Sequence, residues 1–265
     1  MKKRHLTPIL LAFIGLAALS FTTATGVTLR LHPSKTRGQA SPYTITSKAT
    51  MMTMMEVQGQ SINSNQTVET RQSFSAKEVT DEQIVIETQV EAIKMSVSQM
   101  GMKLEYDSEH PEKASPMLAG QTKDIEKNLK KPVTVTYDVM GKVIGDPTTL
   151  EMNQLSNAII ELPEEELTVG SKWSREKTQS LSGTEIKVNM EYTVTDISKK
   201  SVDVSFTGNI DSKEASGTYN GTASFNPQTG LITNSTTKVN ISMTISEQGL
   251  SLPVTMVGTT TVEVK

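Results

Sequence analysis

Residues 186–194 read Ile-Lys-Val-Asn-Met-Glu-Tyr-Thr-Val, a strict alternation of apolar and polar side chains. Successive side chains of a β-strand point to opposite faces, so this stretch predicts a strand with one buried and one wetted face. The same pattern returns at 202–206 and at 238–245. Alternation of this kind is typical of antiparallel sheets, which often cover only one of their faces.

Further alternating segments lie on both sides of this stretch, at 27–31, 84–90 and 254–264. Residues that favour turns separate the segments, and the clearest example is Asn226-Pro227-Gln228-Thr229-Gly230. Several segments are longer than the usual strand of about five or six residues. Because wide sheets of long strands twist and curl, the sequence predicts a mainly β protein with one large, curved antiparallel sheet, similar to half a barrel.

Two segments depart from the alternation, at 116–131 and 148–162, and each is followed by a proline. Their apolar residues recur near helical spacing, so we expect two short helices that cover the apolar face of the sheet. Apolar positions of the first half also align with those of the second. This weak repeat suggests two related half-sheets at about 25–147 and 163–265, although alternating strands can match by chance.

Length and composition limit the possible functions. The chain has 265 residues, no cysteine, 26 Lys and Arg, and 29 Asp and Glu, which give a net charge of −3. The lack of cysteine excludes disulfides, zinc–thiolate sites and thiol nucleophiles. A weakly acidic chain is also unsuited to general nucleic-acid binding, which needs a basic surface. The 14 methionines indicate a core that flexible side chains fill.

Residues 1–24 have the three parts of a secretory signal, namely a basic start, an apolar stretch and a small-residue end. We expect cleavage after Ala24, with cleavage after Ser20 as the alternative, which leaves 25–265 as a single exported β-rich domain. An uncleaved anchor helix is the other interpretation, although the apolar run is shorter than the ~20 residues that span a bilayer. The expected location is the periplasm or the outside of the cell, with at most peripheral membrane contact.

The most distinctive phrase of the chain is Leu162-Pro163, followed by Val169-Gly170 and then Trp173; segments 100–108 and 225–230 add less specific matches. In this order of phrases the chain resembles a family of uncharacterised exported proteins of the Bacteroidota type. The resemblance implies export and a mostly antiparallel sheet, and it carries no catalytic residues. The expected curved sheet with helical lids is also similar to that of bacterial lipoprotein carriers, which is an analogy of fold alone.

No segment carries an established catalytic or metal-binding motif. Residues 107–112 bring together three carboxylates and a histidine that could ligate a divalent cation, but their spacing fits a solvated loop better than any known motif. Four of the five residues at 51–55 are Met, which could bind copper(I) but also suit core packing. The Ser motifs of hydrolases are missing. We therefore predict no enzymatic activity, no metal and no cofactor.

The apolar face of the predicted sheet is the best candidate for a binding surface. Loosely filled by Met and small residues, it could hold a lipid or another apolar ligand. We therefore predict a non-enzymatic binding or carrier module of the cell envelope. The alternative is a structural or protein-interaction domain of the envelope, with a packed core, no ligand and an envelope protein as its partner. The expected lining residues are Met190, Tyr192, Val204, Phe206, Val239, Ile241 and Met243.

Overall fold

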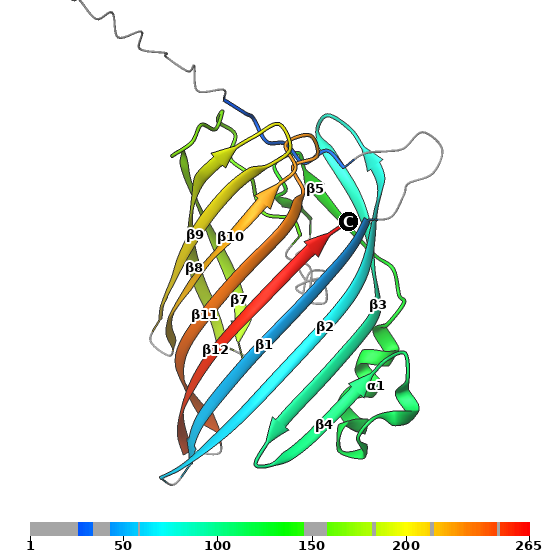
Figure 1. Cartoon of the computed structure of the whole chain (residues 1–265), viewed down its shortest axis with the longest axis vertical. Helices are drawn as coiled ribbons and strands as arrows, with labels where there is room; N and C mark the ends of the chain where they lie inside the picture. Colours follow the sequence, from blue (N-terminus) through cyan, green and yellow to red (C-terminus); the bar gives the residue numbers. More distant parts are fainter. Residues whose placement is uncertain are drawn as a thin grey trace, which may run out of the picture.

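The computed structural model describes residues 26–33, 43–57, 59–145, 158–181, 184–212, 215–247 and 250–265. Its main feature is a single antiparallel sheet of 12 strands (Figure 1). The strands are β1 (Tyr43–Val57), β2 (Gln60–Val79), β3 (Gln83–Gln99), β4 (Met102–Asp107), β5 (Val133–Asp138), β6 (Val143–Ile144), β7 (Lys172–Leu181), β8 (Thr184–Ile197), β9 (Val202–Asp211), β10 (Ala215–Phe225), β11 (Ile232–Glu247) and β12 (Leu250–Val264).

The strand order is β6-β5-β3-β2-β1-β12-β11-β10-β9-β8-β7, and β4 pairs with β3 off this path. Most neighbours in the sheet are also neighbours in the sequence. The exception at the centre is the pair of β1 with β12, which runs from Ile45 opposite Val264 to Met55 opposite Val254. Strands from the first and second halves of the chain therefore belong to one continuous sheet.

The sheet curves around its inner face but does not close (Figure 1). The strands at the two ends of the order, β6 and β7, do not pair with each other within the described residues. Irregular pairing, which increases local twist, occurs at Arg71/Gln72 between β2 and β3 and at Val194/Asp196 between β8 and β9. The prediction of a mainly β, antiparallel sheet is confirmed.

The two faces of the sheet differ in polarity as the alternation predicts. In β9, Val202, Val204 and Phe206 point inward and are at most 6% exposed, whereas Thr207 points outward and is exposed. The outward positions of β10, β11 and β12 carry mainly Ser, Thr, Asn and Lys. The inner face therefore holds the core, and the outer face suits contact with water.

The helical part of the described chain is small, and the expected pair of covering helices is not confirmed. Segment 116–131 contains a 3-10 turn, η2 (Pro116–Leu118), and the helix α1 (Ala119–Asn128), while a second turn, η1 (Pro111–Lys113), precedes them. Figure 1 shows α1 beside the edge strand β4, where covering a strand edge limits unwanted pairing. Most of 148–162 lies outside the described residues, and its described end, 158–162, is not helical.

Within the described chain, two irregular segments, 26–33 and 158–163, cover one end of the inner face. Leu29 and Leu162 are completely buried against the sheet. Backbone hydrogen bonds hold both segments, since the Leu31 N–H donates to Val139 O at 2.7 Å and the Leu162 N–H donates to Met140 O at 2.7 Å. Irregular chain can be buried here because its backbone polar groups find partners.

Candidate functional site

A cavity of about 320 Å³ lies on the inner face, beside the end that the irregular segments cover. Sites for small molecules range from about 300 to 1,000 Å³, so this cavity is at the small end of that range. Strands β7 to β11 supply most of its wall, and segment 158–163, the turn before β6 and the start of β6 supply the rest. Its apolar lining includes Val188, Met190, Tyr192, Phe206, Tyr219 and Ile160.

Glycines in the middle of the sheet help to form this hollow. On the inner face, Gly208 lies between Met190 of β8 and Tyr219 of β10. A Cβ atom at Gly208 would lie 2.3 Å from Met190 Sδ, so the glycine lets the methionine lie flat on the strand. Gly221 of β10 makes room for the Phe206 ring in the same way, because a Cβ atom at Gly221 would lie 2.5 Å from Phe206 Cζ. Large side chains therefore lie along the sheet instead of filling the space above it.

A stack of aromatic rings continues from the cavity wall into the core. The rings of Trp173 and Tyr192 are parallel, with centroids 4.9 Å apart, and Tyr192 contacts Phe206 at 5.7 Å in a tilted arrangement. Burial raises the pKa of Tyr192 to about 12, so its phenol is neutral at physiological pH. Trp173 is the single tryptophan of the chain, and its contact with a cavity-lining residue makes its fluorescence a reporter of the site.

Arg175 of β7 provides the polar wall of the cavity. It lies opposite Met190, on the inward side of the strand. Its Nη2 donates to Leu162 O at 2.6 Å, and its Nε lies 3.2 Å from Glu161 Oε1. Arg175 thereby links segment 158–163 to the edge strand β7. Among the described residues, no atom accepts a well-aligned hydrogen bond from Nε, which is buried.

The seven residues predicted to line a ligand site all lie on the inner face, but at different places. Met190, Tyr192 and Phe206 line the cavity. Val204 is 1% exposed in the core cluster beside it. Val239, half-buried, belongs with Ile241 and Met243 to a neighbouring cluster. The structure therefore brings three of the seven together around one hollow.

The sequence interpretation missed Tyr219, Arg175 and Glu161. Arg175 follows the inward-facing Trp173 by two residues, so strand alternation places both on the same face, and this signal could have found it. Glu161 lies in an irregular segment, where no periodicity indicates the direction of a side chain. Its position beside Arg175 depends on contacts that only the folded chain provides.

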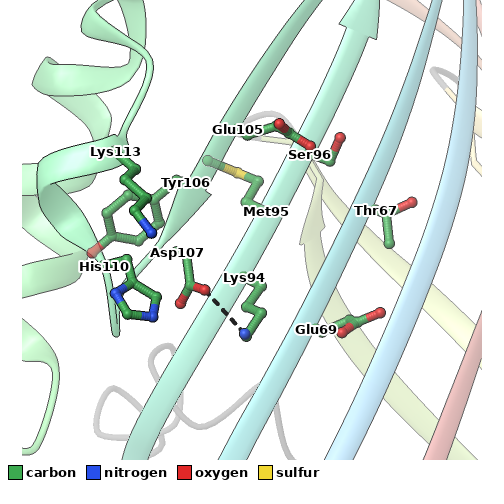
Figure 2. A pocket seen from close by; sticks show the side chains of 10 residues that line it. All are labelled: Thr67, Glu69, Lys94, Met95, Ser96, Glu105, Tyr106, Asp107, His110 and Lys113. Atoms are coloured by element: carbon green, nitrogen blue, oxygen red, sulfur yellow. Dashed lines mark ion pairs between the residues drawn. The ribbon is translucent and has the colours of Figure 1, made fainter.

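A second hollow, of about 410 Å³, lies across β2, β3 and β4 and contains part of segment 107–112 (Figure 2). Here Lys94 Nζ contacts Asp107 Oδ2 at 3.0 Å, and Arg71 Nη2 contacts Glu109 Oε1 at 2.7 Å. A hydrogen bond from the Glu109 backbone, together with Lys94, lowers the pKa of Asp107. The carboxylates thus have cationic partners from this chain. Among the described residues, no group of three or more His, Cys, Asp or Glu side chains could hold a metal ion.

The methionines of segment 51–55 are divided between the two faces of β1. Met51 and Met55 pack against the inner cluster around Ile241 and Met256. Met52 points outward and is 38% exposed. Because neighbouring strand residues face opposite ways, the consecutive methionines do not converge on one point.

Comparisons with known proteins identify a related sequence family but no activity. Residues 151–249 match the model of a family of unknown function, DUF6263. The matched part includes β7 to β11, which form most of the cavity wall. This match supports the resemblance of the chain to an uncharacterised family. No curated protein matches the chain.

Among solved structures, the chain is similar to the translocator domain of the autotransporter NalP from Neisseria meningitidis. The identity is 8%, over 84% of this chain and 88% of that chain, with a TM-score of 0.23. A likeness at this TM-score carries no argument about function. Within the described parts of the chain, no helix has the length and apolar character needed to cross a membrane.

Proposed function

We propose that the protein is a non-enzymatic module that binds an apolar small molecule in the cavity on its inner face. The observation that carries this proposal is the hollow of about 320 Å³ beside Met190, Phe206 and Tyr219. Burial of apolar ligand surface there would gain about 25 cal/mol per Å². A site of this kind, with mostly apolar walls and a few polar groups, is typical of small-molecule binding.

The polar outer face and the N-terminal segment suggest where the protein works. Outward Thr, Ser, Asn and Lys side chains suit contact with water, so a ligand held inside would be shielded from it. The signal-like pattern of residues 1–24 favours export. Together these features support a binding or carrier role in the cell envelope, either in the periplasm or outside the cell, with at most peripheral membrane contact.

The alternative is a structural or interaction domain without a ligand, and one observation favours it. Val204, Ile241 and Met243 are at most 5% exposed, so much of the inner face is filled by the protein itself. A packed inner face explains its apolar residues without any ligand. The two functions differ in whether the cavity accepts a molecule from solution.

Filling the cavity tests the proposal. Thr237 lines the cavity, whereas its neighbour Thr236 points to the outer face. We expect Thr237→Phe to weaken binding of the neutral apolar probe N-phenyl-1-naphthylamine at least about tenfold, because the new ring occupies the hollow. The matched control Thr236→Phe should bind the probe like the unaltered protein. Probe fluorescence measures binding, and circular dichroism verifies that both variants fold.

Two results would overturn the proposal. One is failure of the unaltered protein to bind the probe, and the other is equal binding by both Phe variants. Native mass spectrometry of the protein, purified from its own cells without detergent, gives an independent readout. A copurified lipid or other apolar molecule supports the proposal, whereas a bare mass that persists after incubation with envelope lipid extract supports the structural alternative.

A further inference from the structure

We infer that the ligand of this cavity is an anionic amphiphile, with an apolar chain and a negatively charged head that Arg175 and Lys142 hold. This inference rests on the proposed function, because it concerns the same cavity. Both cations line the cavity together with apolar side chains. Charged groups that bind a carboxylate at the edge of an apolar hollow select for a molecule that has both properties.

The guanidinium of Arg175 is only partly used by the protein. Nη2 and Nη1 donate to the backbone oxygens of Leu162 and Ser174, at 2.6 and 2.9 Å. These two bonds fix the position of the guanidinium. Nε has an ion-pair neighbour in Glu161 Oε1 at 3.2 Å, but no well-aligned hydrogen-bond acceptor among the described residues. An oxygen that aligns with Nε–H would therefore improve on the present contact.

The carboxylate of Glu161 occupies the position beside Arg175 that the charged head of the ligand would take. Its side chain is 38% exposed and can turn into water without losing a buried position. A ligand carboxylate that takes the place of Glu161 Oε1 would meet the fixed guanidinium and restore its ion pair. Glu161 therefore acts as an internal competitor for the ligand head.

Lys142 is the second cation at the cavity. It follows a tight turn in which Asp138 Oδ1 accepts hydrogen bonds from the backbone N–H groups of Met140 and Lys142, at 2.9 and 2.8 Å. Glu176, the other carboxylate at the cavity, pairs with Lys187 at 3.0 Å. Among the described residues, Lys142 has no ion-pair partner. The cavity therefore carries a cation for which the described chain supplies no counter-ion.

The volume of the cavity sets the size of a suitable probe. At about 30 Å³ for each water-sized group, a cavity of about 320 Å³ holds about ten such groups. A ten-carbon chain is therefore suitable, and decanoate, 1-decanol and decyltrimethylammonium offer the same chain with a negative, neutral and positive head. Trp173 fluorescence can follow all three titrations at neutral pH, because Trp173 stacks on the cavity-lining Tyr192.

We expect decanoate to bind the full chain about tenfold to a hundredfold more tightly than 1-decanol, since hydrogen bonds to charged groups contribute about 1.5–3 kcal/mol. Lys142→Gln should reduce this decanoate-to-decanol ratio, because it removes a cation. Glu161→Gln should increase the ratio, because it removes the competing carboxylate. Lys238, which points outward from β11, provides the control, and Lys238→Gln should leave the ratio unchanged.

The three probes separate the two proposals. If decanoate and 1-decanol bind equally well, the cavity recognises only the apolar chain, and the inference about an anionic head is wrong. Tighter binding of decyltrimethylammonium also overturns the inference, because it reverses the sign of the charge preference. If none of the probes binds, the proposed function fails and this inference fails with it. If Lys142→Gln and Lys238→Gln change the decanoate-to-decanol ratio equally, Lys142 does not contact the head of the ligand specifically.

Discussion

The inner face of the sheet has a covered region around Leu29, Leu162 and Phe225 and an open region around Met190 and Tyr219. All three residues of the covered region are completely buried, whereas Met190 and Tyr219 are half-buried and line a cavity. The strand residues of both regions come from segments with the same alternation of apolar and polar side chains. Alternation therefore determines which face is apolar, but it does not determine whether that face is filled.

The difference between the regions arises from the irregular segments that lie against the sheet. Segment 26–33 is held where the His32 N–H donates to Thr229 O at 2.8 Å. The fit is close there, since a Cβ atom at Gly230, whose φ is +66°, would lie 2.3 Å from Arg30 O. No comparable segment covers Met190 and Tyr219 within the described chain. Within the described chain, the covering segments therefore separate core from cavity, together with the strand glycines Gly208 and Gly221 that keep the open region hollow.

The largest expected effect compares one residue from each region. Phe225→Ala should reduce the free energy of unfolding by about 3–5 kcal/mol, because it leaves a void in a fully buried site. Met190→Ala should cost less than about 2 kcal/mol, because Met190 already borders open space. Urea unfolding of both variants at neutral pH measures the two changes. Equal losses would show that the open region is as well packed as the covered one.

A smaller effect concerns Tyr192, which joins the two regions. Its pKa is raised by burial from 10.0 to about 12, so the neutral phenol stabilises the fold. This contribution is complete below pH 10 and should be lost as the pH rises through 12. The loss amounts to about 2–3 kcal/mol, since each pKa unit corresponds to about 1.36 kcal/mol.

Phenolate absorbance and urea unfolding between pH 9 and pH 12 test this expectation. Tyr192→Phe should remove part of the alkaline loss of stability, while Tyr137, whose pKa burial also raises to about 12, should still contribute. If Tyr192 ionises near pH 10 in the folded protein, water reaches it freely, and the covered region is more open than its burial indicates.

The smallest expected effect lies on the outer face and sets the baseline for the other two. Lys48 and Glu69 pair across β1 and β2 at 2.7 Å, with side chains 55% and 44% exposed. A double-mutant cycle with Lys48→Ala and Glu69→Ala should give a coupling energy below about 1 kcal/mol, because water and salt screen the pair. Thermal unfolding at low and high salt measures it. A much larger coupling would mean that outer-face charges, as well as inner-face packing, determine stability.

Much of the fold could be predicted from local patterns. Alternation at 186–194 and 202–206 predicted the strands, their antiparallel arrangement and the inward direction of Met190, Tyr192 and Phe206. The helix near 116–131 was found only in part, since α1 is short and lies beside an edge strand. Strand pairing satisfies backbone groups in the same way at each position, so a regular sequence pattern is enough to predict it.

The irregular segments and the polar side of the cavity could not be predicted in this way. Ile159, Ile160 and Leu162 have near-helical spacing, yet the described segment 158–162 is irregular and not helical. Its conformation follows from hydrogen bonds to Met140 and Arg175, which are distant in the sequence. Spacing within the segment carries no information about such partners.

The sequence by itself determined the mainly β class, the polar outer face and the apolar inner face, because side-chain alternation is a local property of a strand. Only the tertiary structure decided that β1 pairs with β12, that Leu29 and Leu162 are buried on the sheet, and that a cavity with Arg175 in its wall remains beside them. These features depend on contacts between residues that are far apart in the chain. No local pattern specifies such contacts, because their free energy exists only once the sheet has formed.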